Sequence, residues 1–290
     1  MAGKSPLLLC GRCSPETNNL VPPVMKHCLP LLAFALATTA HAAVVLTDNF
    51  NDTSNWTKAG DPFTAESTAD TGNLFGGGTE NNYLNLVFTA GSSIHVLHTA
   101  QSLSLGTTGQ IAFDFYEPVV DGATGAGIIL RLGTNTGNGG TAFAVSLRRG
   151  GLFAANLPSV GVDTANPIAT YSQLSRHTLT VVFNNTASSI SYGNDNYTLA
   201  GSQIDVWLDG ARVGSGLAAV AGNSLTGSNI TTINFTDKAG TASTLYLDNF
   251  EARTDITIGT TVPEPATEAT LAGLLALAGT LVLRHWRRRG

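Results

Sequence analysis

The stretch 110–116 reads QIAFDFY and decides the fold class. Ile111, Phe113 and Phe115 occupy alternate positions, and the residues between them are small or polar. An alternation of period two with one apolar side is typical of an antiparallel strand that has one face on a core and the other towards solvent. We therefore predict a strand here and search for partners with the same pattern.

Segments of the same kind recur along the chain. Between them lie runs such as GGGTENN, GTNTGNGG and SYGNDN, which supply the Gly and Asn residues that tight turns require. No 3.6-residue periodicity intervenes, so the pattern predicts an all-β antiparallel sandwich forming one domain over 43–260. The remaining predicted strands are 44–50, 82–88, 93–100, 127–133, 141–149, 151–157, 177–184, 202–210, 230–237 and 243–252.

Composition agrees with strands and turns rather than helices. The chain has 290 residues, of which 43% are hydrophobic and only 12% are charged. Between residues 43 and 262 there are 8 Lys and Arg against 17 Asp and Glu, a balance of −9. Because nucleic-acid binding needs a basic face, this acidic body excludes nucleic acid as a partner.

The motif Asp-Asn-Phe occurs at 48–50 and again at 248–250, so we expect the first and last strands to lie side by side. The body resembles the concanavalin A-like lectin and glucanase superfamily, including its laminin-G-like members. The resemblance is carried by RHTLTVVFNNTASSISYG at 176–193 and IDVWLDGARVGSG at 204–216. It implies a jelly-roll sandwich. A galactose-binding-like sandwich is the alternative, because LYLDNFEA at 245–252 is typical of its last strand.

The body lacks the usual catalytic patterns. The glucanase branch carries a Glu-x-Asp-x-Glu run on one strand, and no such run exists here. There is no Gly-x-Ser-x-Gly motif, and all three cysteines precede residue 43. We predict that the protein is not an enzyme, with a polysaccharide hydrolase as the weaker alternative.

Two kinds of ligand site remain. Hard cations take oxygen ligands from loops, and pairing of the terminal strands would bring together Asp48, Asp52 and Asp248, so calcium is the one cofactor hypothesis. Sugars stack on exposed aromatic rings. The candidates for a sugar contact are Trp56, Tyr192 and Tyr197, of which the two tyrosines flank a probable loop.

The front of the chain carries an export signal. A short basic start at residue 25 leads into an apolar run, and Ala40 and Ala42 are the small residues that signal peptidase requires before its cut. We therefore assign 25–42 as a signal peptide. Because such a signal starts near the N-terminus, residues 1–24 are interpreted as an over-extended start.

The end of the chain combines three ordered elements. Residues 262–265 form a Val-Pro-Glu-Pro motif, an apolar stretch at about 267–283 predicts a transmembrane helix, and arginines follow. Arginines stay on the cytoplasmic side of a membrane, so the body would lie outside the inner membrane. The motif residues are Val262, Pro263, Glu264 and Pro265, and the basic cluster is Arg284, Arg287, Arg288 and Arg289.

This ending, 262–290, resembles the PEP-CTERM sorting signal of Gram-negative bacteria. The resemblance implies an exosortase as a partner, an inner-membrane intermediate with a periplasmic body, and delivery to the cell surface or extracellular matrix. A plain single-span anchor is the alternative. We predict an exported structural or adhesive protein linked to exopolysaccharide, with a lectin-like carbohydrate-binding module as the second hypothesis.

Overall fold

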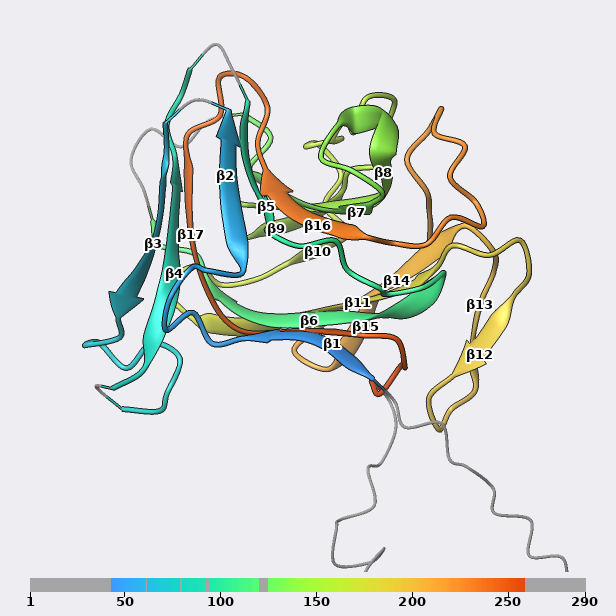
Figure 1. The fold of residues 1–290 in the computed structure, drawn as a ribbon, viewed down its shortest axis with the longest axis horizontal. Helices are drawn as coiled ribbons and strands as arrows, with labels where there is room; N and C mark the ends of the chain where they lie inside the picture. Colours follow the sequence, from blue (N-terminus) through green and yellow to red (C-terminus); the bar gives the residue numbers. More distant parts are fainter. Residues whose placement is uncertain (1–42, 61, 79, 92–93, 120–124, 259–290) are drawn as a thin grey trace, which may run out of the picture. The chain divides into compact units, whose positions relative to one another are not determined.

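The computed structural model describes residues 43–60, 62–78, 80–91, 94–119 and 125–258, all of which belong to one compact unit, His41–Gly290. Within them the chain is all-β and antiparallel, and two sheets face each other (Figure 1). The first, sheet A, has the order β15-β14-β11-β6-β17-β4-β3, with β1 also paired to β17. Its strands are β15 (Ala211–Ala218), β14 (Gln203–Leu208), β11 (Arg176–Asn184), β6 (Thr108–Tyr116), β17 (Ser243–Arg253), β4 (Asn82–Phe88), β3 (Thr64–Ala69) and β1 (Val44–Asp48).

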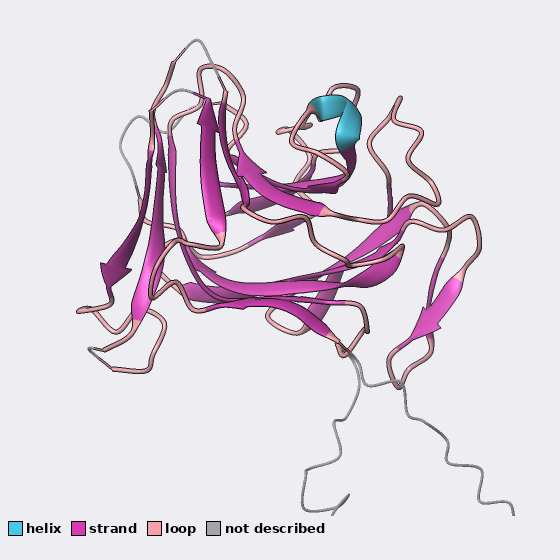
Figure 2. Cartoon of the chain, in the orientation of Figure 1, coloured by secondary structure: helices cyan, strands magenta, loops and turns pink. Residues whose placement is uncertain are grey.

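The second, sheet B, has the order β10-β9-β8-β7-β16-β5-β2. A separate hairpin, β12 (Ile190–Tyr192) with β13 (Tyr197–Leu199), and a short 3₁₀ helix, η1 (Asn138–Gly140), complete the described elements (Figure 2). The strands of sheet B are β10 (Ala169–Thr170), β9 (Gly151–Ala154), β8 (Thr141–Arg148), β7 (Ile128–Gly133), β16 (Thr232–Thr236), β5 (His95–Thr99) and β2 (Trp56–Gly60).

The main core lies between the two sheets and is rich in aromatic rings. Phe113 of β6 is stacked with Phe250 of β17 at 6.0 Å between ring centroids and meets Phe235 of β16 edge-on at 5.6 Å. Rings of this size bury much apolar area, and edge-to-face contacts add to the stabilisation. The prediction from QIAFDFY is confirmed, because Ile111, Phe113 and Phe115 are all buried.

Strand β17 joins the two ends of the body. It pairs with β6 on one side, and with β4 and then β1 on the other. Its register with β6 shifts between Asp248 and Glu251, where Asn249 has φ 50°, and such a bulge turns a side chain out of the regular alternation. The predicted pairing of first and last strands is confirmed, since Asp48 lies opposite Phe250.

Some strands carry no sequence signal of the expected kind. Strands β2 and β3 read WTKAG and TAESTA and contain few apolar residues. Strand β15 reads ARVGSGLA, in which two glycines interrupt the apolar pattern. These strands form because neighbouring strands offer unpaired backbone groups, and strand preference depends strongly on such context. The predicted segment 151–157 is a strand only as far as Ala154.

The export and sorting assignments fall outside the described part of the chain. The signal peptide at 25–42, the Val-Pro-Glu-Pro motif, the stretch 267–283 and the terminal arginines all belong to 1–42 or 259–290. Among the residues that the structure describes, no helix has the length and apolar character needed to cross a membrane.

Candidate functional site

The outer face of sheet A, turned away from the core, carries a polar and aromatic lattice near the middle of the sheet. On β6, Tyr116 and Asp114 point outward because Phe113 and Phe115 point inward. Antiparallel pairing sets Tyr246 opposite Tyr116 and Asp248 opposite Asp114. Directly opposed residues on one face are close neighbours, so two tyrosines and two carboxylates form adjacent rows.

Three tyrosines form the aromatic part of this lattice, which we call the tyrosine row: Tyr83, Tyr246 and Tyr116. The rings of Tyr116 and Tyr246 are stacked, 5.8 Å apart with 6° between their planes, and Tyr83 is 4.7 Å from Tyr246. All three side chains are half-buried, and none of their hydroxyls bonds to another described residue. Burial, with the neighbouring Tyr246 and Asp70, raises the pKa of Tyr83, so its hydroxyl stays neutral.

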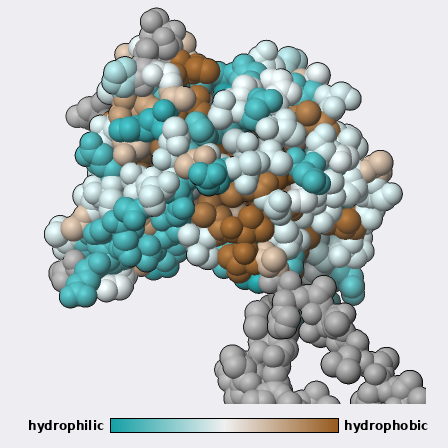
Figure 3. All heavy atoms as spheres, viewed as in Figure 1, coloured by the Kyte–Doolittle hydropathy of each residue, from teal (hydrophilic) through white to brown (hydrophobic). Residues whose placement is uncertain are grey.

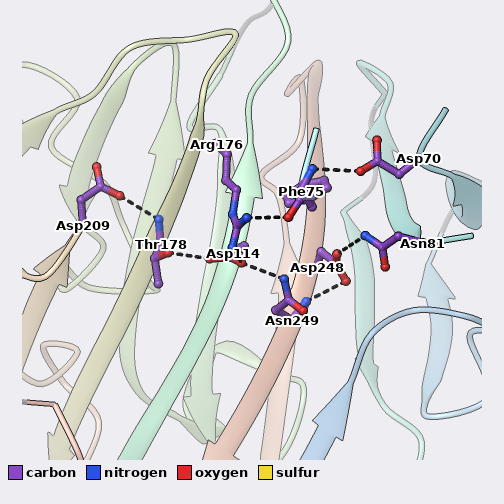
Figure 4. Close-up of polar contacts among 9 residues, drawn as sticks. All are labelled: Asp70, Phe75, Asn81, Asp114, Arg176, Thr178, Asp209, Asp248 and Asn249. Atoms are coloured by element: carbon purple, nitrogen blue, oxygen red, sulfur yellow. Dashed lines mark hydrogen bonds and ion pairs between the residues drawn. The ribbon is translucent and has the colours of Figure 1, made fainter. Parts of the chain in front are cut away.

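The two carboxylates form a layer beneath the exposed groups. Asp114 accepts hydrogen bonds from Arg176 Nη2 at 2.6 Å, from Thr178 Oγ1 at 2.5 Å and from Asn249 Nδ2 at 2.8 Å (Figure 4). Asp248 accepts one from Asn81 Nδ2 at 2.8 Å and one from the backbone N–H of Asn249 at 2.8 Å. Their oxygens are thus occupied from several sides.

The electrostatics of the pair are unequal. Asp248 is fully buried, and this burial raises its pKa, with a further contribution from the charge of Asp114. Hydrogen bonds from Asn81 and Asn249 oppose the rise. Asp114 has the guanidinium of Arg176 as a direct counter-charge. Since a buried charge is costly unless paired, burial favours the neutral form of the Asp248 carboxyl.

A loop that includes residues 70–78 borders the lattice on one side. Asp70 is fully buried and accepts the N–H groups of Leu74 at 2.7 Å and Phe75 at 2.9 Å, which fixes the loop as a turn. Arg176 donates to the Phe75 carbonyl while its side chain remains 44% exposed. In Figure 4, Arg176 lies between Phe75 and Asp114 and ties the loop to the sheet.

A depression of about 390 Å³ adjoins the lattice where β1 meets β17. Asn249, which is exposed, lies both on its wall and above Asp114 and Asp248. Figure 3 shows hydrophilic surface at lower left, where Figure 1 places the ends of β3 and β4. The depression is lined by Thr47, Asp48, Asn49, Asn249, Phe250 and Glu251.

The arrangement suits binding rather than acid–base chemistry. The carboxylates are at most 5% exposed, so they orient Arg176 and Asn249 instead of reaching a ligand themselves. The groups at the surface are flat aromatic rings whose hydroxyls have no partner among the described residues, one guanidinium and one amide. Rings with a polar edge next to fixed donors are the usual composition of a site for a ligand with both apolar and hydroxylated faces.

The structure does not assemble the predicted calcium ligands. The Asp48 carboxylate accepts three hydrogen bonds, from the N–H of Phe50, from Asn55 Nδ2 and from Trp56 Nε1. Asp52 is exposed and accepts only from Ser54, whose local hydrogen bonds lower the pKa of Asp52. Across the described ranges no group of three or more His, Cys, Asp or Glu side chains is placed to hold a metal ion.

The predicted sugar contacts also lie differently from the expectation. Trp56 is only 7% exposed and packs against Phe50, Phe235 and Phe250 in the core, so its ring has no free face. This corrects its assignment, which rested on residue type alone. Its indole N–H donates to Asp48 at 2.8 Å, which satisfies the polar end of the ring.

Tyr192 and Tyr197 belong to the β12–β13 hairpin. Tyr192 is 6% exposed, and its hydroxyl donates to Asp205 at 2.5 Å, so it too is a packing residue. Tyr197 remains partly exposed, with its hydroxyl on Asp195 at 2.7 Å and Arg212 over its ring at 5.2 Å. The hairpin therefore covers one part of sheet A, and the tyrosine row occupies another.

Sequence analysis did not select the tyrosine row. A signal was present, because NYLNLVF at 82–88 buries Leu84 and Leu86 and so turns Tyr83 to the opposite face. The same alternation in β17 turns Tyr246 outward between Leu245 and Leu247. The sequence pattern does not predict the strand order, and it is the strand order that brings residues more than 160 positions apart into contact.

One further constellation has the composition of a catalytic triad. His177 Nδ1 is 2.7 Å from Asp209 Oδ2, and its Nε2 is 3.4 Å from Ser172 Oγ. The same Nε2 lies 2.9 Å from the carbonyl oxygen of Ser172, an acceptor only. A nitrogen that donates to a carbonyl cannot also take a proton from the hydroxyl, so these contacts tie the 172–177 loop to the turn at Asp209.

Comparisons with known proteins give no family match and structural similarity at low sequence identity. No protein-family model matches the sequence, and no curated protein matches it. Among solved structures, the chain is similar to a carbohydrate esterase from the Shiga toxin-encoding bacteriophage phi24B, with 17% identity and a TM-score of 0.46 over 74% of this chain and 100% of the other.

Two more solved structures are similar in the same range. One is a family 11 carbohydrate-binding module from Clostridium thermocellum in complex with a β-1,3-1,4-mixed-linked tetrasaccharide, with 15% identity and a TM-score of 0.37, covering 73% of this chain and 95% of that one. The other is the cellulose-induced protein Cip1, with 13% identity and a TM-score of 0.46, covering 75% and 99%. At these values the likenesses say nothing about ligand or activity.

Proposed function

We propose that this chain is an exported, concanavalin A-like β-sandwich that binds polysaccharide on the outer face of sheet A. The observation that carries the proposal is the tyrosine row beside Arg176 and Asn249. The rings offer flat apolar surfaces, and the buried carboxylates fix the neighbouring donors in direction. Fixed donors reduce the ordering cost of binding, which is how a shallow site gains affinity.

The delivery part of the proposal rests on sequence. The signal peptide at 25–42 would export the chain, and the PEP-CTERM-like ending at 262–290 would stop it in the inner membrane for an exosortase. The function would then be structural or adhesive, in contact with exopolysaccharide at the cell surface or in the matrix. Mass spectrometry of the mature protein tests this part, with processing near Ala42 and near Pro263–Pro265 as the expected result.

Binding is tested by affinity electrophoresis of the full-length protein through gels that contain neutral polysaccharides, such as a mixed-linkage β-glucan or dextran. We expect retardation by at least one glycan, and a loss of about tenfold in affinity, or about 1.4 kcal/mol, in Tyr246→Ala. Tyr197→Ala is the matched control, since it removes a partly exposed tyrosine outside the row. Equal retardation of Tyr246→Ala and wild type would remove the basis of the proposal.

A further inference from the structure

A second depression lies at the far edge of sheet B, around the turn that joins β8 to β9. It has a volume of about 290 Å³, and we call it the arginine depression. Its location differs from that of the tyrosine row, which is on sheet A. Its lining includes Arg148, Arg149, Phe153, Thr164, Pro167 and Thr170.

The turn that carries the arginines is held rigidly. Arg148 and Gly151 pair as the last residues of the hairpin, so Arg149 and Gly150 form a two-residue turn with φ values of 48° and 71°. Both φ values are positive, as the common tight hairpin turn requires. Glu117 accepts the two N–H groups of the turn at 2.6 and 2.7 Å and the hydroxyl of Tyr171 at 2.8 Å.

Neither arginine side chain forms an ion pair with a described residue, although the Glu117 carboxylate binds the backbone N–H groups of the turn. The described arginines that form ion pairs are Arg176, Arg212 and Arg253, and neither Arg148 nor Arg149 joins them. Arg148 Nε is buried and has no hydrogen-bond partner among the described residues. The Arg149 side chain, by contrast, is exposed, so its guanidinium is accessible to a ligand.

We propose that the arginine depression binds a carboxylate-bearing sugar, a uronic acid unit of an acidic polysaccharide. Guanidinium groups recognise carboxylates through paired charge-assisted hydrogen bonds. Thr164 and Thr170 are exposed members of the same lining and can supply hydroxyls for hydrogen bonds to a sugar, and the exposed Pro167 provides apolar surface. Because the body carries a balance of −9, the attraction comes from this local pair and not from the overall charge.

This site deepens the proposed function without depending on the tyrosine row. Two sites on opposite sheets would let one chain join two polysaccharide segments, one neutral and one acidic. A protein with that property would cross-link a matrix rather than only coat it.

The test is the affinity of the purified full-length chain for polygalacturonate and for dextran, measured by biolayer interferometry at low and high salt. We expect polygalacturonate binding that weakens with salt and falls about tenfold or more in Arg148→Gln/Arg149→Gln. Lys58→Gln is the control, because Lys58 is exposed on β2 at the opposite edge of sheet B. Circular dichroism and the melting temperature establish that each variant is folded.

Two results would overturn the assignment: the double variant binds polygalacturonate as tightly as wild type, or wild type does not bind it. Loss of dextran binding in Tyr246→Ala with unchanged polygalacturonate binding would show two independent sites. If Tyr246→Ala leaves neutral-glycan binding intact while the arginine variant loses the acidic glycan, the proposed function on sheet A fails and the arginine depression stands.

Discussion

The outer face of sheet A has two regions built from the same kinds of side chain, one covered and one open. In the covered region, the β12–β13 hairpin lies over Trp207 and Val182, and Tyr192 and Leu199 fill the space between. In the open region, no hairpin of the described structure covers Tyr246 and Tyr116, and Tyr83 is flanked by Phe75, with 5.8 Å between the ring centroids. Whether an outward-facing tyrosine of this sheet is buried or exposed therefore depends on which other segment of the chain packs over it.

The aspartate–arginine ion pairs of the covered and open regions also differ. In the covered region, Asp205 is fully buried and accepts from Arg212, from the Tyr192 hydroxyl and from the N–H of Gly216, all within the fold. In the open region, Asp114 is also paired with an arginine, but that arginine is 44% exposed. Asp205 therefore holds the β12–β13 hairpin against the sheet through the Tyr192 hydroxyl, whereas Asp114 holds the Arg176 side chain as a donor near solvent.

The largest expected effect is on the covered region. Replacing Trp207 by alanine would remove the ring that meets Tyr197 at 5.0 Å and Tyr192 at 6.4 Å, and we expect a loss of roughly 3–5 kcal/mol in the free energy of unfolding. Urea denaturation measures it. Tyr246→Ala, in the open region, should cost less than half as much, and equal costs would contradict the distinction.

A smaller loss is expected when one hydroxyl is removed from the covered network. Tyr192→Phe deletes the donor to Asp205 and the acceptor for Trp207 Nε1, which lies at 3.2 Å, and should lower the free energy of unfolding by about 1–2 kcal/mol. Tyr116→Phe is the matched control, because its hydroxyl has no partner among the described residues. A loss of the same size in both variants would show that the two regions do not differ in this way.

The pH dependence of stability should reveal the raised pKa of Asp248. A carboxyl whose pKa is higher in the folded than in the unfolded chain stabilises the fold at low pH and loses that contribution as the pH rises through its folded value. Burial raises the pKa of Asp248 above 3.8, so the stability of the wild type should fall as the pH increases from 3.8. Asp248→Asn should abolish this fall. Melting temperatures across the acidic range would show it, and parallel curves for the two proteins would contradict it.

The smallest effect is expected at the exposed end of the β12–β13 hairpin. Tyr197→Phe removes a hydroxyl whose hydrogen bond, within the described part of the chain, goes to Asp195 two residues away, and it leaves the ring under Arg212. We expect a change within about 0.5 kcal/mol in the free energy of unfolding, as for most surface substitutions. A loss comparable with that of Tyr192→Phe would mean that the Tyr197 hydroxyl stabilises the β12–β13 hairpin as much as the Tyr192 hydroxyl does.

Local pattern was enough for the main strands and not for the site. The alternation in 110–116 and 243–252 predicts strands with the correct inward faces, because burial on one side enforces a period of two. The pairing of the two Asp-Asn-Phe motifs followed from the proximity of chain ends. Strand β3 and the β12–β13 hairpin carry little periodic signal, and their place depends on neighbours.

The site escaped prediction for a related reason. Trp56 and Tyr192 were selected as large aromatics near loops, yet their polar atoms find Asp48 and Asp205 inside the fold. Tyr83 and Tyr246 meet only because β4 and β17 are adjacent, and adjacency across 160 residues is a property of topology. The bulge at Asn249, which bonds to Asp114 and lines the depression beside β1, is likewise invisible in the sequence.

Hydrogen exchange of the full-length protein with and without a bound neutral oligosaccharide tests the central claim most directly. The account predicts that ligand slows exchange in β4, in β17 around residues 244–249 and at the end of β6, with no change in the β12–β13 hairpin. Protection centred on 190–199, or protection that leaves β17 unchanged while the sugar is bound, would contradict it.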